Sequence, residues 1–349
     1  METRLEAFRE KIGERRPLCI RGGGSKDFHG GPQQGEVLDT TGYAGIIDYT
    51  PSELVLTARC GTPLAEINSA LAARRQMLAF EPPAFSEAAT IGGVVAAGLA
   101  GPRRGTAGGV RDHLLGVRLM DGEGRVLNFG GQVMKNVAGF DVSRLMAGSL
   151  GTLGLMLEVS LKVLPMPRCE ATLRFELPQA RAIEAVNHWA GEPLPISASC
   201  WRDGVLHLRL SGAEAAVAAA CAKLGGEKTG ADEAANFWAD LGAQRMAFFA
   251  GDAPLWRVSV PSATPVLDLP GPTLIEWGGA LRWLRCEADR ALIESRSGAA
   301  AAVALFRGGD RQVGVFPRPA PAVQTIFRRL KTVFDPHGLF NRGRLFPDF

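Results

Sequence analysis

The chain has 349 residues, of which 46% are hydrophobic and 21% are charged. That length and composition suffice for two domains of ordinary size with substantial cores, and they exclude one small domain. The net charge is only +3, and the arginines are scattered among acidic residues, which argues against nucleic acid as a partner.

The first 17 residues alternate in charge and contain no apolar core. They predict a short amphipathic helix and exclude a secretory signal. The longest apolar, glycine-rich run, residues 91–101, is about half of the roughly 20 residues that a membrane-spanning helix needs. We therefore expect a cytoplasmic protein whose membrane association is at most peripheral.

A run of three glycines follows at residues 22–24, between Arg21 and Ser25. Glycine backbone can bring its N–H groups close to an anion, for which a pyrophosphate is the expected candidate. A surface turn is the alternative. No third glycine stands where the nicotinamide fingerprint requires one, which argues against a Rossmann site, and no Gly-Lys pair is followed by a hydroxyl residue, so a Walker site has no support.

Short strands are predicted at residues 37–40, 45–49 and 51–58. A helix follows, which we expect Thr62 to cap, with Pro63 in its first turn. Glycines then crowd residues 92–109, a composition that suits close contact with a planar ligand or, alternatively, close helix packing. Two apolar runs around Asp121-Gly122 predict a hairpin over residues 114–129.

Residues 164–168 form a Pro-rich linker, after which the pattern changes. Helices are predicted at 179–190 and 213–224 and strands at 196–201 and 204–210, which fits a ferredoxin-like α+β unit. A second such unit is expected from the strand 255–260, the run 273–285, the helix 287–296 and the strand 301–306. A further helix is predicted over residues 322–334.

These segments, taken in order, resemble the flavin-binding domain of the vanillyl-alcohol oxidase and para-cresol methylhydroxylase (PCMH) superfamily. The motifs that carry the resemblance are 21–25, Pro82-Pro83, Thr90-Ile91-Gly92-Gly93, Gly105-Thr106, Asp121-Gly122, 135–141 and 148–154. The implied fold class is α+β, with a PCMH-type FAD-binding domain of two α/β subdomains and a ferredoxin-like α+β cap. The expected division is 1–165 for the FAD-binding domain, 166–318 for the cap and 319–349 for a C-terminal helix and tail that return to the first domain.

Within the superfamily the chain is similar to the FAD-binding subunits of bacterial glycolate oxidases. Its C-terminal residues 334–345 resemble the closing Asp-Pro…Asn-Pro-Gly-Lys element of that family, although Arg342 replaces the usual proline and Arg344 the usual lysine. The resemblance implies that FAD is bound by residues of these motifs: Arg21, Gly22, Gly23, Gly24, Ser25, Lys26, Pro82, Gly92, Gly93, Gly98, Gly101, Gly105, Thr106, Asp112, Gly151, Gly154, Glu158, Asn341 and Arg344.

Relatives with covalent flavin carry a histidine where this chain has Ser25, so the resemblance implies noncovalent FAD. We expect His29, the nearest imidazole, to be a surface-loop residue. The six cysteines form no Cys-x-x-Cys pair and no cluster with histidine, so they exclude a recognisable iron–sulfur or zinc site and are expected to be buried free thiols. The cap has only His188 and His207, and no metal triad can be assembled from them.

Catalytic residues cannot be assigned from the sequence. His207 and Arg209 alternate with leucines, so both side chains lie on one face of a strand. They could act as a base and an anchor for a substrate carboxylate, but a face exposed to solvent is the favoured interpretation. Ser149 superficially resembles a nucleophile elbow but leads into a strand. Aromatic residues around 237–256 are expected in the core in preference to a partner interface.

The resemblance implies a subunit of a complex that oxidises glycolate, a 2-hydroxy acid, to glyoxylate. The expected partners are a larger homologous flavin subunit, which does most of the substrate chemistry, and an iron–sulfur subunit, which receives electrons. Two alternatives remain open. One is a self-sufficient FAD-dependent D-2-hydroxy-acid dehydrogenase that uses Arg209 or another cap residue, and the other is a non-catalytic assembly scaffold.

Overall fold

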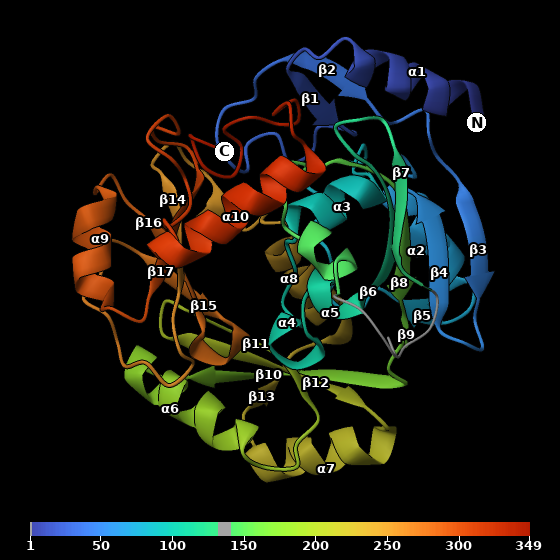
Figure 1. The fold of residues 1–349 in the computed structure, drawn as a ribbon. Coiled ribbons are helices and arrows are strands. Elements are labelled where there is room, and N and C mark those ends of the chain that lie inside the picture. The colour runs from blue at the N-terminus through green and yellow to red at the C-terminus, as the bar shows by residue number, and fades with distance from the viewer. Residues whose placement is uncertain (1, 132–140) are drawn as a thin grey trace.

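The computed structural model describes residues 2–131 and 141–349 (Figure 1). Two sheets organise these residues. In the first half of the chain, five described strands form one antiparallel sheet in the order β3-β4-β8-β6-β7. Their bounds are β3 Ile46–Thr50, β4 Val55–Arg59, β6 Leu114–Met120, β7 Val126–Gly130 and β8 Leu155–Lys162.

Smaller elements complete this half. The parallel pair β1–β2 and the antiparallel pair β5–β9 flank the sheet, and short helices pack around it. Their bounds are α1 Glu2–Gly13, β1 Leu18–Arg21, β2 Glu36–Asp39, α2 Leu64–Ala72, β5 Gln76–Met77, α3 Ile91–Ala97, α4 Arg104–Ala107, α5 Val110–His113, the 3-10 turn Ser143–Met146 and β9 Leu164–Pro165.

The helix predicted after Thr62 is present, but its predicted cap is wrong. Pro63 occupies the N-cap position and the helix has no side-chain cap. The Thr62 hydroxyl instead donates to the Arg59 carbonyl at 2.6 Å and accepts the Gly45 N–H at 2.9 Å. The hydroxyl therefore ties the end of β4 to the loop before β3, a tertiary contact that competes with capping.

The second half contains one eight-stranded sheet among the described residues, in the order β13-β10-β12-β11-β15-β16-β14-β17. Its strands are β10 Cys169–Glu176, β11 Ile196–Arg202, β12 Val205–Gly212, β13 Glu227–Lys228, β14 Leu255–Ser259, β15 Thr273–Glu276, β16 Leu281–Arg285 and β17 Ala302–Arg307. The helical segments are α6 Gln179–Ala190, α7 Glu214–Leu224, α8 Ala231–Gly242, α9 Arg290–Ser297 and the 3-10 turns Ala247–Phe249 and Trp277–Gly279.

This sheet is two ferredoxin-like units joined edge to edge. The strands of each unit, numbered along the chain, lie in the spatial order 4-1-3-2, as β13-β10-β12-β11 and as β17-β14-β16-β15. The second unit has no helix between β14 and β15, where residues 260–272 run as a loop. The units join where β11 pairs antiparallel with β15, for example Cys200 opposite Glu276. The sequence predicted the units but not this pairing.

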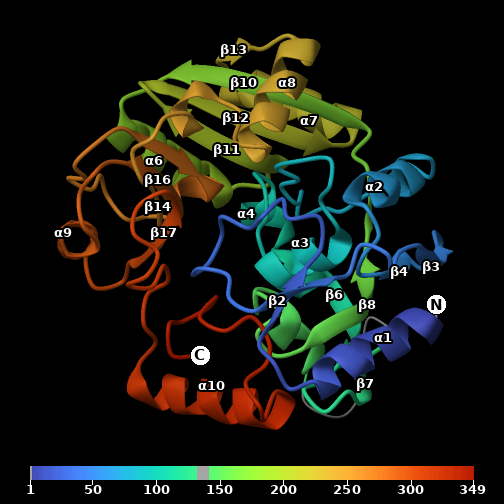
Figure 2. The ribbon, with the colours of Figure 1, turned by 90° about the horizontal axis from the view of Figure 1, so that it is seen from above.

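Helices α3 and α4 lie between the two sheets, and α4 contacts β11 (Figure 2). The C-terminal helix α10, Pro321–Phe334, leads into a tail that reaches back to β1. There the Asn341 N–H donates to the Leu18 carbonyl at 2.9 Å.

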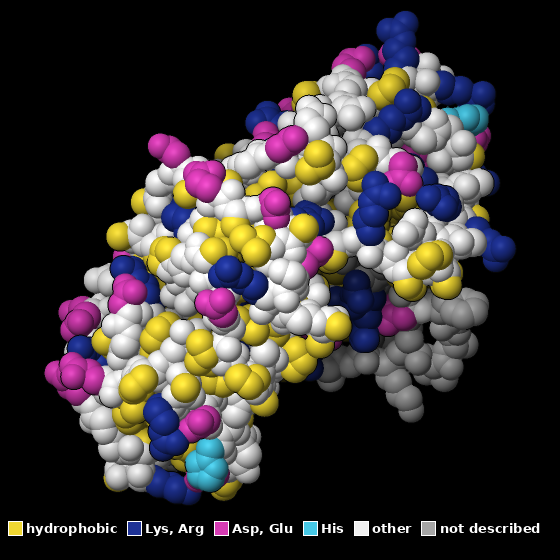
Figure 3. Space-filling view, turned by 90° about the vertical axis from the view of Figure 1, so that its left-hand side faces the viewer, with side chains coloured by type: hydrophobic (Ala, Val, Ile, Leu, Met, Phe, Trp, Pro, Cys, Tyr) yellow, Lys and Arg dark blue, Asp and Glu magenta, His cyan; other side chains and the backbone are white. Residues whose placement is uncertain are grey.

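The cores agree with the expected hydrophobic pattern. Trp238, Phe248 and Phe249 are buried in one cap cluster, and Trp256 is buried in another. All six cysteines are free, but Cys169 and Cys221 are only partly buried, so the expectation of burial is wrong for these two. On the face drawn in Figure 3, basic, acidic and hydrophobic side chains are interspersed. Among the described residues, no helix is long and apolar enough to cross a membrane.

Candidate functional site

The glycine run is a loop that lies directly against another backbone segment. It follows β1, and a Cβ on Gly23 would lie 1.5 Å from the Ala88 carbonyl oxygen. A Cβ on Gly22 would lie 2.4 Å from the Thr90 hydroxyl oxygen. The glycines are therefore required by close packing, and an ordinary surface turn does not account for them.

This loop and the segment at the start of α3 line one cavity of about 100 Å³. Within the described chain, the backbone N–H groups of Gly23, Gly24 and Ser25 have no hydrogen-bond acceptor. Gly92 and Gly93 line the same cavity from α3. A cradle of unused N–H groups and small residues suits an anion such as a pyrophosphate.

Lys26 adds a buried cation to this cavity. Its side chain is only 9% exposed, and its ammonium has one hydrogen bond in the described structure, to the Ser25 hydroxyl at 3.2 Å. Burial lowers the pKa of Lys26 to about 8. Arg21 differs, because its guanidinium is paired with Asp27 at 2.7 Å. Lys26 is thus the cation of this loop that lacks an acidic partner.

The C-terminal tail closes the cradle from the other side. The Asn341 side-chain oxygen accepts the Ile20 N–H at 2.6 Å, and its amide donates to the Leu150 carbonyl at 2.6 Å. Arg344 donates to the carbonyls of Asp27, at 3.1 Å, and Gly31, at 2.6 Å. Burial lowers the pKa of Arg344 to about 10. Both side chains line the cavity, but their polar groups are used to position its loops.

A second and larger cavity, of about 450 Å³, adjoins the first at Ala97, which lines both. One wall consists of small residues, with Ala97 at the end of α3, Gly98 and Gly101 after it, and Gly148 before β8. A Cβ on Gly98 would lie 2.9 Å from the Gly148 Cα, so this wall is made largely of backbone. Such a wall suits a flat ring system.

The opposite wall comes from the cap sheet and is charged. Arg257 on β14 and Glu276 at the end of β15 line it, together with aromatic residues such as Trp283 and Phe306. Glu276 accepts a hydrogen bond from the Trp283 indole at 2.7 Å. Burial raises the pKa of Glu276 to about 7 and lowers that of Arg257 to about 10.

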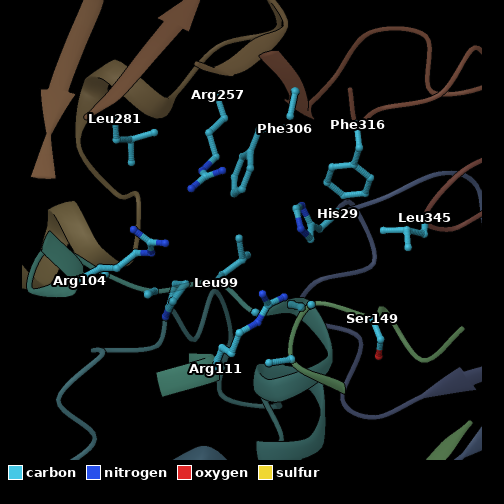
Figure 4. A pocket seen from close by; sticks show the side chains of 18 of the residues that line it. His29, Leu99, Arg104, Arg111, Ser149, Arg257, Leu281, Phe306, Phe316 and Leu345 are labelled. Atoms are coloured by element: carbon cyan, nitrogen blue, oxygen red, sulfur yellow. The ribbon is translucent and has the colours of Figure 1, made fainter. Parts of the chain in front are cut away.

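Three guanidinium groups, from α4, α5 and β14, converge on this cavity: those of Arg104, Arg111 and Arg257 (Figure 4). The indole of Trp277 lies beside two of them, with its ring centroid 4.6 Å from Arg104 Cζ and 5.1 Å from Arg257 Cζ. In the described residues none of the three forms an ion pair with an acid. The cavity is therefore electropositive.

His29 lies at the edge of the same cavity, contrary to the expectation of a surface-loop residue. It is 6% exposed, and its ring contacts Phe306 and Phe316 (Figure 4). Its Nδ1 has no hydrogen-bond partner among the described residues. Burial, with neighbouring cations, lowers the pKa of His29 to about 3, so the imidazole is neutral at neutral pH. The chain reverses direction here and buries a loop that reads as polar in the sequence.

The structure brings most predicted cofactor residues to these two cavities. Residues 21–26, Gly92, Gly93, Gly151, Gly154, Asn341 and Arg344 line the first, and Gly98 and Gly101 line the second. The following predicted residues, all described, line neither cavity: Pro82, Gly105, Thr106, Asp112 and Glu158. Residues 135–140 of the predicted motifs lie outside the described residues.

Several of these outlying residues have contacts within the protein. Thr106 donates to the Ser197 carbonyl at 3.0 Å, Asp112 accepts the Gly109 N–H at 2.7 Å, and Glu158 pairs with Arg118 at 2.8 Å. The α carbon of Trp277 lies 3.3 Å from where a Cβ on Gly105 would be placed. Their assignment to the cofactor stays a prediction.

Arg209 and His207 do not enter either cavity. Arg209 is only 6% exposed and makes bonds of 2.9 and 3.0 Å to both carboxylate oxygens of Glu81, so the favoured solvated face is wrong for this residue. His207 stacks on Phe237 with ring centroids 4.0 Å apart. Ser149 donates its hydroxyl to the Met146 carbonyl at 2.9 Å, which is a turn contact.

Arg104, Arg257 and Glu276 were missed by the sequence reasoning. A charged residue inside the apolar strand 255–260 is the signal that points to Arg257, but the same signal selected Arg209. Only the order of the strands in the sheet shows whether Arg209 or Arg257 points into the cavity. No group of three or more His, Cys, Asp or Glu side chains that could hold a metal ion occurs among the described residues.

Comparisons with known proteins show the fold and the family of the chain. A family model described as an FAD binding domain matches residues 6–130. The solved structure of alkyldihydroxyacetonephosphate synthase superposes with a TM-score of 0.64 at 15% identity, covering 97% of this chain and 74% of that one, which shows the fold alone. The fold, the cradle and the family match define an FAD-binding flavoprotein of the PCMH type, from a family of FAD-dependent oxidoreductases.

Two curated relatives specify the family. The chain is 47% identical over 345 residues to "Glycolate oxidase subunit GlcE" of Escherichia coli (strain K12), which covers 99% of this chain and 97% of the relative. It is 36% identical over 91 residues to "Glycolate oxidase subunit GlcD" of Bacillus subtilis (strain 168), which covers 26% of this chain and 19% of that protein. The chain belongs to the family of the glycolate oxidase subunit GlcE.

Proposed function

We propose that this chain is the noncovalent FAD-binding subunit of a complex that oxidises glycolate to glyoxylate. The observation that carries the proposal is the 47% identity to a glycolate oxidase subunit over nearly the whole length of both chains. The two adjoining cavities add a physical reason. A cradle that suits a pyrophosphate adjoins a flat wall of backbone that suits a ring system, and a flavin dinucleotide contains both groups.

In this proposal the unused N–H groups of residues 23–25 and the Lys26 ammonium hold the pyrophosphate. The wall around Gly98 and Gly148 supports the flavin ring and keeps water from one of its faces. When bound, FAD supplies the acceptor for the hydride removed from the 2-hydroxy acid. Ser25 stands where covalent relatives have a histidine, so no side chain at that position forms a bond to the flavin.

The proposed partners are a larger homologous flavin subunit and an iron–sulfur subunit. The name of the closely similar relative, a subunit, supports assembly, and the match to a second glycolate oxidase subunit supports a homologous flavin partner. The iron–sulfur subunit follows from the family resemblance. The proposal places the complex in the cytoplasm, at most peripherally on a membrane.

An absorption spectrum tests the cofactor and the division of labour. The purified full chain with added FAD, after removal of free flavin, is expected to show bound flavin bands, and acid precipitation should release all of the flavin into solution. Anaerobic glycolate should leave these bands oxidised in the isolated chain and bleach them when the partner subunits are present.

The other outcomes decide between the alternatives. Bleaching in the isolated chain would make it a self-sufficient dehydrogenase. The absence of bound flavin would refute the FAD proposal and support a scaffold. Arg209 no longer supports the dehydrogenase alternative, because Glu81 occupies its guanidinium.

A further inference from the structure

We propose that this chain has a carboxylate site of its own, in which Arg257 and Arg104, both beside the Trp277 ring, bind the carboxylate of a small 2-hydroxy or 2-oxo acid. The proposed function is used only to choose this class of acid. The location and charge of the site come from the second cavity.

The first argument is the placement of like charges. Arg104 and Arg257 approach the same indole, at 4.6 and 5.1 Å from its centroid. Burial and, after it, the charge of Arg104 disfavour the charged form of Arg257, whose pKa is lowered to about 10 although Glu276 acts in the opposite direction. Among the described residues no carboxylate lies within ion-pair distance of either group. Arg257 is partly buried and Arg104 is exposed, so water screens part of their repulsion, and Glu276 on the same wall offsets part of the Arg257 charge. An anionic ligand between the two guanidinium groups would offset the repulsion that remains.

The second argument compares Arg257 with the fully buried arginines. Arg209 has the carboxylate of Glu81, Arg282 donates to the carbonyls of Gly279, Pro265 and Thr264, and Arg344 donates to the loop carbonyls described above. Each of these three is satisfied inside the protein. In the described structure no protein acceptor is hydrogen-bonded to the guanidinium of Arg257, which extends into the cavity (Figure 4).

The third argument is that the neighbouring titratable groups leave the cavity positive. Glu276 is the acid of this wall, and its pKa is raised to about 7, so near neutral pH it carries only part of a negative charge. His29 is neutral there, and Arg111 adds a further cation. The apolar neighbours Leu99, Leu281 and Phe306 lower the local polarity (Figure 4). A carboxylate paired with a guanidinium in such surroundings is bound more strongly than in water.

The test titrates the FAD-loaded full chain with oxalate, an unreactive dicarboxylate, and follows the flavin absorption change and the heat of binding. We expect saturable binding by the native chain and none for oxamide, the neutral isostere. Arg257→Met should raise the Kd at least tenfold, Arg257→Lys by less, and Arg104→Met by a few-fold. Arg202→Met is the matched control. It removes an arginine at the end of β11 that is paired with Asp203, and it should leave the Kd unchanged.

Three results would overturn the proposal: no saturable oxalate binding by the native chain, an unchanged Kd in Arg257→Met, or loss of FAD from Arg257→Met with the fold intact, which would make this arginine a flavin contact. Thermal unfolding checks each fold. If Arg257→Met does not fold, Arg257→Lys and Arg104→Met decide by the same criterion. If the native chain binds no FAD, the proposed function fails, while calorimetry with oxalate still tests the arginine site.

Discussion

The two cavities differ in how the chain builds them. The cradle takes its N–H groups and its cation from a single stretch, residues 22–26, held by glycines and by the C-terminal tail. The larger cavity takes its charged groups from α4 and α5 in the first half of the chain and from the cap strands β14 and β15 in the second half. A contiguous binding element can be recognised from a motif, whereas a dispersed one depends on strand order.

The cavities share one electrostatic feature. Each holds a cation that forms no ion pair in the described structure, the buried Lys26 in the cradle and the partly buried Arg257 in the larger cavity. Burying such groups lowers the stability of the unliganded protein. This arrangement is typical of sites where stability is exchanged for binding. The following variants separate cradle, cavity and framework.

The largest expected effect is that of Gly23→Ala on the cradle. Its Cβ would lie 1.5 Å from the Ala88 carbonyl oxygen, so the loop must move by more than an ångström. We expect FAD affinity to fall by roughly 100-fold or more, because displacements of this size commonly cost that much. Flavin absorbance per chain measures it. Gly13→Ala, where no atom lies within 4 Å of the new Cβ, is the control. Full FAD content in Gly23→Ala would show that the loop is not the cradle.

Arg209→Met tests the framework outside the two cavities. Removal of a buried ion-pair partner leaves Glu81 partly uncompensated, so the free energy of unfolding should fall by about 3–4 kcal/mol. FAD content and oxalate affinity per folded chain should not change. Urea unfolding and the flavin spectrum report the two quantities. Unchanged stability with lost oxalate binding would return Arg209 to the ligand site.

Glu276→Gln tests the charged wall through pH. The folded pKa of about 7 lies above the ordinary value of 4.5, so the unfolded chain ionises first as pH rises. The native protein should therefore lose about 3 kcal/mol of stability from this group between pH 4.5 and 7, and Gln should remove that loss. The measurement is the difference in unfolding free energy between the native protein and the variant across this pH window. The contributions of other titrating groups, such as His29, are the same in both proteins and cancel in this difference. A difference that does not vary with pH would contradict the burial of this carboxyl.

The smallest effect is expected for Lys26→Met, and it has opposite signs for stability and binding. The folded pKa of about 8 lies below the ordinary 10.5, so the charged lysine destabilises the FAD-free fold at and below pH 8, and this penalty fades as pH rises towards 10.5. Methionine should stabilise the FAD-free protein by roughly 2 kcal/mol near pH 7. FAD affinity should fall by roughly tenfold or more, because a charge-assisted bond is lost.

Thermal unfolding with and without FAD measures both changes. Lys223→Met, at an exposed ion pair with Glu192, serves as the control and should change neither quantity appreciably. A Lys26→Met protein that is more stable and binds FAD as tightly as the native chain would remove Lys26 from the cofactor site.

Local patterns predicted the secondary structure well. The helix at 179–190 was predicted with the bounds that the structure has, and the Asp121 hairpin is present with Leu119 opposite Leu127. The predictions failed where tertiary contacts decide. Thr62 bonds to the end of β4 and to the loop before β3 and caps no helix, and His29 is buried although its neighbours are polar. Neither outcome has a signal in the adjacent residues.

The sequence by itself determined the secondary structure of many segments, because turn residues and apolar periodicity are local properties with local physical causes. The class of protein followed from the resemblance of its ordered motifs to a known superfamily. The sequence also predicted the cradle, because its N–H groups and its cation are consecutive in the chain. Only the tertiary structure decided that Arg209 meets Glu81 while Arg257 faces a cavity. The two arginines lie in similar apolar strands, and the order and register of those strands in the sheet determine which guanidinium finds a partner inside the protein.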